Sequence, residues 1–234
     1  MAGFGLALEA LTSSDVSKAE KIRAMEKDID HYEDVLGTFL TKLARAQISD
    51  DDSSEVSKLL KVIGDLERIS DHSVNVLESV EEMREKQIRF SPGADQEMKT
   101  LCDALSEILE KTLDALRRND VAAASSVEPL EQVIDDLKDA IRDNHVARLK
   151  GGECTVEAGF ILSDLLTDLE RSSDHCSNIA LCIIDAVRHN MNAHEAIRRL
   201  RKNNPVFEEQ YISYSRKYTI STRNDESGKS LANS

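Results

Sequence analysis

Pairs of carboxylates spaced four residues apart are the side chains of this sequence best suited to chemistry. One pair, Glu67 and Asp71, lies in an eleven-residue segment that begins at Asp65 and recurs 103 residues later from Asp168, with eight of the eleven positions identical. Residues four apart project from one face of a helix, where two like charges destabilise an isolated helix by about 0.2–0.5 kcal/mol. The repetition therefore predicts a compensating partner, and a bound cation is the simplest one.

A second pair of carboxylates precedes the first in each copy. Glu26 and Asp30 recur at an offset of 105 residues as Glu131 and Asp135. Because consecutive helices joined by a short turn pack antiparallel, the carboxylates of each copy are expected to converge. Hard cations such as magnesium, calcium and manganese, and also iron, accept all-oxygen ligation. The predicted metal ligands are Glu26, Asp30, Glu67 and Asp71 in the first copy and Glu131, Asp135, Glu170 and Asp174 in the second.

A solvated acidic face is the alternative to a metal site. The chain contains 44 Asp and Glu residues, so pairs at this spacing also arise by chance. The matched positions of the pairs in both copies, beside an apolar row that includes Leu60 and Ile63, favour ligation. The histidines of the repeated segment, His72 and His175, are either partners of the ligands or polar residues at a helix interface. No nucleophile–base grouping or phosphate-binding loop occurs, so we predict that the protein is not an enzyme; a metal-dependent phosphohydrolase is the more distant alternative.

Long helices are needed to position these carboxylates. Only three Pro and nine Gly occur, and stretches rich in Ala, Leu, Glu, Lys and Arg favour helix. Apolar periodicity predicts helices at about Asp15–Gln47, Ser53–Ile88, Ala94–Arg118, Val121–Leu149, Cys154–His189 and Ala193–Tyr218. The first of these carries an apolar stripe formed by Ile22, Met25, Ile29, Tyr32, Leu36, Phe39, Leu40 and Leu43.

The duplication predicts an all-α fold of two tandem three-helix bundles. We assign residues 1–90 to repeat 1, 91–190 to repeat 2, 191–218 to a C-terminal helix and 219–234 to a disordered tail. The first helix of repeat 1 is truncated, because only Met1–Leu11 corresponds to the longer Asp95–Leu116 of repeat 2. We interpret the chain as cut from a longer one, and expect the resulting edge to expose Phe4, Leu6 and Leu8 and to promote self-association.

Composition excludes several functional classes. The net charge of −14 argues against a nucleic-acid partner, which demands clustered Lys and Arg, and against an anionic membrane surface. No apolar run approaches the roughly 18–20 residues of a spanning helix, and Met1–Leu11 lacks signal-peptide features, so a cytoplasmic protein is expected. The four cysteines form no C-x-x-C pair and are interpreted as buried small hydrophobes.

The two repeated strings, Asp-Leu-Glu-Arg-Ile-Ser-Asp-His from Asp65 and Asp-Leu-Glu-Arg-Ser-Ser-Asp-His from Asp168, resemble the signature of the PhoU family. The resemblance covers about residues 6–218. It implies two three-helix repeats whose acidic motifs bind multinuclear metal clusters, with the eight carboxylates above as ligands. The oxygen ligands leave magnesium, calcium, manganese and iron as candidate metals. Ser70 and Ser173 stand where the family commonly has Gly, which removes no ligand.

Two branches of the family fit the chain. One is the stand-alone regulator of phosphate uptake and signalling, and the other is the cytoplasmic domain of a bacterial sodium/phosphate cotransporter. The segments Gly37–Leu43 and Phe207–Tyr218 resemble the transporter branch, and the short first helix agrees with it. The resemblance thus favours a metal-binding regulatory domain at the cytoplasmic face of the membrane, with the transporter's membrane domain as partner in cis. A metal-free helical scaffold is the competing interpretation.

Overall fold

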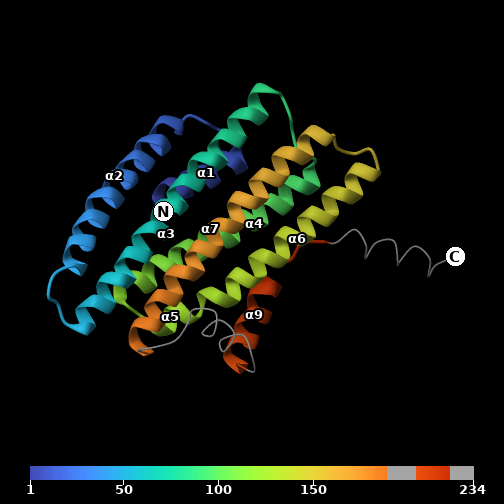
Figure 1. Cartoon of the computed structure of the whole chain (residues 1–234). Helices are drawn as coiled ribbons and strands as arrows, with labels where there is room; N and C mark the ends of the chain where they lie inside the picture. Colours follow the sequence, from blue (N-terminus) through green and yellow to red (C-terminus); the bar gives the residue numbers. More distant parts are fainter. Residues whose placement is uncertain (189–203, 222–234) are drawn as a thin grey trace.

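The computed structural model describes residues 1–188 and 204–221, and within these ranges every regular element is a helix (Figure 1). This confirms the predicted all-α class. No helix in the described ranges is long and apolar enough to cross a membrane. The helices are α1 (Ala2–Ser13), α2 (Ala19–Ala44), α3 (Asp50–Glu85), α4 (Pro92–Arg118), α5 (Val121–Ser125), α6 (Val127–Lys150), α7 (Val156–Arg188) and α9 (Pro205–Lys217).

The internal duplication is visible in local backbone geometry. Ser14 follows the last residue of α1 and Asn119 follows the last residue of α4, and both adopt the left-handed conformation, with φ of 54° and 49°. In each copy an Asp follows, and its side chain accepts a hydrogen bond from the backbone N–H two residues later, at 2.9 Å for both Asp15 and Asp120. The 105-residue offset read from the sequence therefore describes two copies of one turn.

Side-chain caps mark the starts of α3 and α4, at Asp50 and Pro92, which lie three and two residues before the predicted starts at Ser53 and Ala94. Ser49 accepts a hydrogen bond from the Asp52 amide at the start of α3, and Ser91 accepts one from the Ala94 amide at the start of α4. The predicted helix from Val121 to Leu149 is instead divided at Ser126 into α5 and α6. The predicted C-terminal helix is described only from Pro205, since 189–203 lie outside the described residues. Residues 222–234 of the predicted disordered tail 219–234 also lie outside them, whereas Ser221 is described and its carbonyl accepts a hydrogen bond from Asn144 at 2.8 Å, which corrects the start of the predicted tail.

The core lies where the two repeats meet. α3 and α7 pack side by side in the centre of the molecule (Figure 1). Val76 and Ile179, which the 103-residue offset aligns, are both fully buried there, and burial of each side chain stabilises the fold by about 1.5–3 kcal/mol. Cys102 and Cys176 are also buried, and burial raises the pKa of each thiol to about 12. Both behave as the small hydrophobes that the sequence indicated.

α4 is fixed to α6 by a buried ion pair. Arg148 of α6 donates two hydrogen bonds to the Glu97 carboxylate, at 2.8 and 2.7 Å, and its side chain is only 3% exposed. Asn144 donates a third bond to Glu97 at 2.8 Å. The N-terminal half of α4 thus covers one flank of α6.

The corresponding flank of α2 is uncovered, which corrects two sequence predictions. Of the predicted apolar stripe only Ile22 and Leu40 are buried, whereas Tyr32, Leu36 and Phe39 are exposed. The expected exposed edge on α1 is wrong as well, because Phe4 and Leu8 are 0% and 3% exposed and Leu6 is half-buried. The short α1 buries its own apolar side chains and leaves those of α2 without cover.

Candidate metal centres

The four predicted ligands of repeat 2 lie near one another; Glu131, Asp135, Glu170 and Asp174 are called cluster 2 here. Burial raises the pKa of Asp135, and the charges of Glu170 and Asp174 raise it further. Burial likewise raises the pKa of Asp174, and Glu170 adds to it, while a hydrogen bond from the Glu131 carboxyl opposes the rise. The electrostatic coupling joins residues of α6 to residues of α7, as the antiparallel arrangement predicts.

A lysine already occupies part of cluster 2. The Lys138 ammonium donates a hydrogen bond to Glu170 Oε1 at 2.7 Å and lies 3.9 Å from Asp135 Oδ1. That Asp135 oxygen is buried and has no hydrogen-bond partner among the described residues. A buried carboxylate oxygen that accepts no hydrogen bond is destabilising, so a further positive charge would stabilise cluster 2.

The predicted ligands of repeat 1, Glu26, Asp30, Glu67 and Asp71, are called cluster 1 here, and they are more open. Glu26 and Glu67 are half-buried, and Asp30 and Asp71 are exposed. Burial, and after it the neighbouring Asp71 and then Glu33, raise the pKa of Glu67 to about 6. The structure therefore couples Glu67 to Asp71 on its own helix and, across to α2, to a residue that the sequence prediction did not include.

Glu33 is the acidic residue that sequence reasoning missed. Its side chain points toward α3, since its Oε1 and Ile63 Cδ1 lie 3.7 and 3.9 Å from the position of a Cβ placed on Gly37. The 105-residue offset aligns Glu33 with Lys138. The alignment of the two repeats contains this position, but Glu33 does not belong to a Glu–Asp pair shared by both copies, because repeat 2 has a lysine there.

Neither cluster forms a ready coordination site in its present side-chain conformations. In the described part of the chain no group of three or more His, Cys, Asp and Glu side chains is arranged to hold a metal ion. The residue types nevertheless suit a hard cation, because all eight predicted ligands are carboxylates on neighbouring helices. Ligation would require rotation of these side chains toward a shared centre.

The rest of the repeated segment joins the two repeats. His72 Nδ1 lies 2.8 Å from Asp168 Oδ1, and His175 Nδ1 lies 2.8 Å from Asp65 Oδ1. The two imidazole rings stack between these contacts, with centroids 5.8 Å apart. The histidines are thus polar residues of the α3–α7 interface, one of the two roles left open by the sequence. The repeated segment is eleven residues long, which is more than a pair of carboxylates four residues apart requires. This extra length was the feature of the sequence that could have indicated a second role for the segment.

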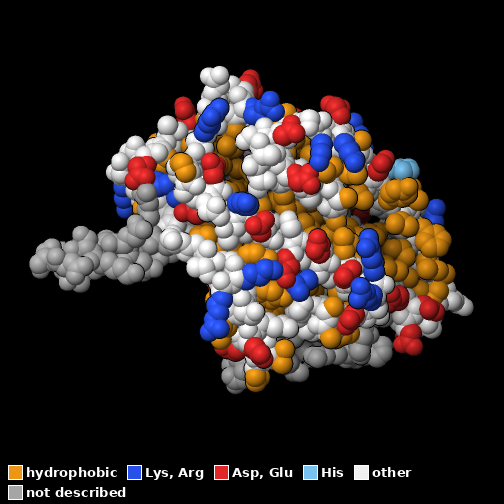
Figure 2. Space-filling model, turned by 180° about the vertical axis from the view of Figure 1, so that it is seen from behind, with side chains coloured by type: hydrophobic (Ala, Val, Ile, Leu, Met, Phe, Trp, Pro, Cys, Tyr) orange, Lys and Arg blue, Asp and Glu red, His pale blue; other side chains and the backbone are white. Residues whose placement is uncertain are grey.

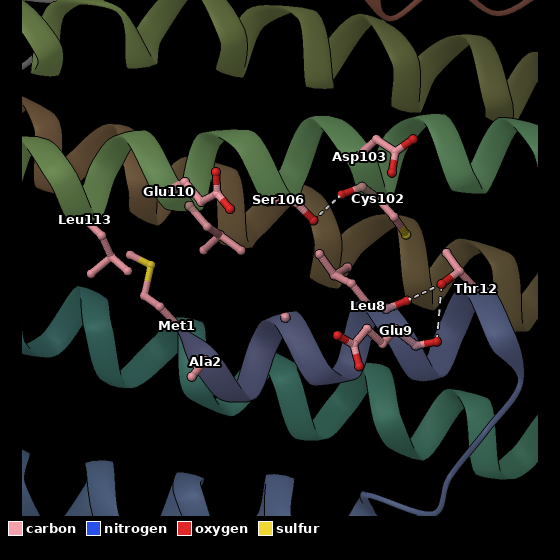
Figure 3. A pocket seen from close by; sticks show the side chains of 12 residues that line it. Met1, Ala2, Leu8, Glu9, Thr12, Cys102, Asp103, Ser106, Glu110 and Leu113 are labelled. Atoms are coloured by element: carbon pink, nitrogen blue, oxygen red, sulfur yellow. Dashed lines mark hydrogen bonds between the residues drawn. The ribbon is translucent and has the colours of Figure 1, made fainter.

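A groove between α1 and α4 provides no alternative site. It encloses about 420 Å³ and has apolar walls that include Leu8 and Leu113 (Figure 3). The hydroxyls of Thr12 and Ser106 donate to carbonyls of their own helices, at 2.9 Å each. The charged side chains that line it are the acidic Glu9, Asp103 and Glu110, so no lining side chain offers a positive charge to an anion.

Comparison with known proteins identifies relatives across both repeats. The family model described as the PhoU domain matches residues 3–80 and 98–183. A phosphate-specific transport system accessory protein PhoU homolog from Pseudomonas putida is 26% identical over 195 residues, which cover 83% of this chain and 75% of the relative. A protein of the same name from Pseudomonas aeruginosa is 26% identical over 197 residues, covering 84% and 81%. Because these relatives are named as accessory proteins, they support the prediction that the chain is not an enzyme.

Solved structures agree with this assignment. The crystal structure of PhoU from Pseudomonas aeruginosa superposes with a TM-score of 0.73 and 25% identity, covering 81% of this chain and 90% of that one. The phosphate transport system regulatory protein PhoU from Streptococcus pneumoniae has the same fold, with a TM-score of 0.65, 23% identity and coverage of 81% and 92%. Two matched segments, one in each repeat, and a shared helical architecture lead to one conclusion: this chain belongs to the PhoU family.

Proposed function

We propose that this protein is a regulator of phosphate uptake and signalling that acts as an accessory protein of a phosphate transport system. The observation that carries the proposal is the family match through both repeats, together with relatives that are named for this role. Those relatives favour the accessory regulator over the cotransporter domain that the segments Gly37–Leu43 and Phe207–Tyr218 suggested. The proposed place of action is the cytoplasmic side of the membrane, with a phosphate transporter as partner.

The two acidic clusters are proposed to bind hard cations such as iron, manganese or magnesium. Cluster 2 supplies Glu131, Asp135, Glu170 and Asp174, and the buried Asp135 oxygen that accepts no hydrogen bond supports a need for additional positive charge there. Cluster 1 supplies Glu26, Asp30, Glu67 and Asp71, to which the structure adds Glu33. A bound cation would neutralise these carboxylates and hold neighbouring helices together.

Phosphate uptake in the host tests the regulatory role. We expect deletion of the gene to change radiolabelled phosphate uptake or its response to external phosphate, and expression of the wild-type protein to restore both. The Asp71→Asn/Asp174→Asn variant tests the clusters, and Asp164→Asn, on an exposed residue of α7, is the matched control. Uptake and phosphate response that are both unchanged by deletion would refute the proposal.

A further inference from the structure

A cysteine and a histidine lie together at the turn between α6 and α7. Cys154 is half-buried in this turn, unlike the buried small hydrophobe that the sequence predicts, and its Sγ lies 3.7 Å from Nδ1 of His145 in α6. A thiol beside an imidazole is the arrangement of an activated nucleophile, because the imidazole can accept the thiol proton. Among the four cysteines, Cys154 is the one whose thiol pairs with an imidazole in the described part of the chain.

Close packing holds the imidazole against the turn. His145 is only 9% exposed, and a Cβ placed on Gly159, in the first turn of α7, would lie 2.6 Å from its Nε2. A side chain at position 159 would therefore displace the ring. Nε2 is buried and has no hydrogen-bond partner among the described residues. The ring thus interacts through Nδ1, the nitrogen that faces the thiol.

The part of α6 that carries His145 is fixed from two sides. Asn144 and Arg148 both donate hydrogen bonds to Glu97 of α4. Asn144 also donates to the carbonyl of Ser221, in the segment after α9. A base that is held on a fixed helix needs little rearrangement to act on its neighbour.

The charge state of His145 suits a proton acceptor. Burial lowers the pKa of His145, and the positive charge of Arg148 lowers it further, against an opposing effect of Glu97. The imidazole is therefore neutral at pH 7, and Nδ1 is free to take up a proton.

The other three thiols have different surroundings. Burial raises the pKa of Cys102 and of Cys176 to about 12, and burial also raises the pKa of Cys182. Because the thiolate is the reactive form of cysteine, these three side chains are expected to react slowly at pH 7.

We propose that Cys154 is a reactive thiol, with His145 as its base, that forms a mixed disulfide with uncharged or cationic low-molecular-weight disulfides. His145 Nδ1 accepts the thiol proton while Cys154 Sγ attacks one sulfur of the disulfide. The S–S bond of that molecule breaks, and its second sulfur leaves as a thiolate that takes the proton from the imidazolium. Cys154 is oxidised and the leaving thiol is the reduced product, so no other oxidant is needed.

Acidic side chains around the turn determine which disulfides react. Glu153 and Glu157 flank Cys154 in the sequence, and both are exposed. Figure 2 shows acidic side chains spread over the face of the molecule in view, in keeping with the net charge of −14. An anionic disulfide is repelled as it approaches such a surface, whereas an uncharged or cationic one is not.

Thiol modification of the full chain tests the role of His145. Purified protein at pH 7 is mixed with dithiodipyridine, an uncharged disulfide whose released thione is followed by absorbance. We expect one thiol to react in a fast phase that Cys154→Ser removes. Cys182→Ser, on a cysteine that is also half-buried, is the matched control and should keep this phase.

His145→Gln separates loss of the base from loss of structure. Removal of the base should slow the fast phase by about tenfold or more, whereas a loosened turn would expose Cys154 and speed it. In concentrated urea the variant and the wild type should react at the same rate. Circular dichroism checks that each variant is folded before urea is added.

The charge of the disulfide provides the second measurement. Cationic cystamine should modify Cys154 several-fold faster than anionic oxidised glutathione, after each rate is divided by the rate with free cysteine. Added salt should reduce this ratio, and mass spectrometry of peptides identifies the modified residue.

Three results would overturn the proposal. They are a fast phase that survives Cys154→Ser, a folded His145→Gln variant that reacts as fast as the wild type, and oxidised glutathione that reacts as fast as cystamine. The reactions contain neither phosphate nor metal. Their outcome is therefore independent of the proposed regulatory role.

Discussion

The two repeats use the same helices but neutralise their acidic faces differently. In repeat 2, Lys138 reaches into the carboxylates of α6 and α7, whereas the aligned position in repeat 1 is Glu33, which adds a further negative charge near Glu67. Their cover differs too, because α4 shields α6 whereas α1 leaves much of α2 exposed. The two copies thus share the scaffold and the carboxylate pairs, but they differ in the charge beside those carboxylates and in how much of the second helix is covered.

The largest expected effect concerns the cover of α6. Glu97→Leu removes the carboxylate that pairs with Arg148, whose side chain is 3% exposed, and leaves a buried charge uncompensated. We expect a loss of about 3–5 kcal/mol in the free energy of unfolding, measured by urea denaturation. In repeat 1 the position aligned with Arg148 is the half-buried Leu43, and Leu43→Ala should cost only about 1 kcal/mol.

The double variant Glu97→Leu/Arg148→Met distinguishes the contribution of the ion pair to stability from that of the packing between α4 and α6. Replacing both charges with apolar groups should recover much of the lost stability, since removal of both partners leaves no buried charge. If Glu97→Leu costs no more than Leu43→Ala, the ion pair does not hold α4 on α6.

Metal dependence is the next largest expected effect and tests the charge difference directly. A cation that binds only the folded protein stabilises it by about 2.7 kcal/mol at one hundred times its dissociation constant. We expect Glu33→Lys to remove the rise in melting temperature that manganese or iron produces through repeat 1. Lys138→Glu should enlarge the response of repeat 2 and destabilise the metal-free protein. Calorimetry with metal and with chelator measures both responses.

Control variants for the Glu33→Lys and Lys138→Glu substitutions lie on the same helices. Lys27→Glu, on an exposed residue of α2, should leave the metal response unchanged, and Asp71→Asn/Asp174→Asn should abolish it with the helices intact. A wild-type melting temperature that neither chelator nor the double Asn variant alters would mean that both faces are merely solvated.

The two histidine–aspartate contacts between the repeats should contribute equally to stability, whereas clusters 1 and 2 should differ in their response to metal. His72→Gln and His175→Gln each weaken one contact to an Asp of the other repeat. The expected loss is about 1–2 kcal/mol for each, and the two losses should agree within about 0.5 kcal/mol. Urea denaturation measures them, with His31→Gln on the exposed face of α2 as control. A large difference between the two losses in the free energy of unfolding would mean that the two histidine–aspartate contacts contribute unequally to stability.

The sequence predicted those features that local patterns determine. Helix periodicity and caps located most of the helices, and the 103- and 105-residue offsets identified both copies and their carboxylate pairs. It did not predict Glu33 as part of an acidic cluster, because that depends on which turns of α2 and α3 face each other. Nor could it decide between the roles of His72 and His175, because their partners, Asp168 and Asp65, belong to the opposite repeat.

Burial at the first helix was harder to predict for the same reason. The short α1 was recognised from the alignment with α4, but Phe4 and Leu8 were expected at the exposed edge. They are buried because α1 packs against α2, α3 and α4 with its apolar side chains inward. The exposed apolar side chains are instead Tyr32 and Phe39, which lie on the neighbouring helix α2.

The smallest expected effect is a pH dependence that distinguishes cluster 1. The pKa of Glu67 is raised to about 6 from an ordinary value of 4.5 by burial, then by Asp71 and Glu33, so the folded state holds this proton more tightly than the unfolded state. The resulting destabilisation is fully present above pH 6 and is relieved as the pH falls toward 4.5. In chelator, the stability of the wild type relative to Glu67→Gln should rise between pH 7 and 5, by less than about 1 kcal/mol because solvent screens the half-buried group. Glu78→Gln, on an exposed residue of the same helix, should show no such trend. With manganese present, the change of this relative stability with pH should reverse sign, because protons compete with the metal for the carboxylates. A pH dependence that the metal does not change would mean that Glu67 is not part of a cation site.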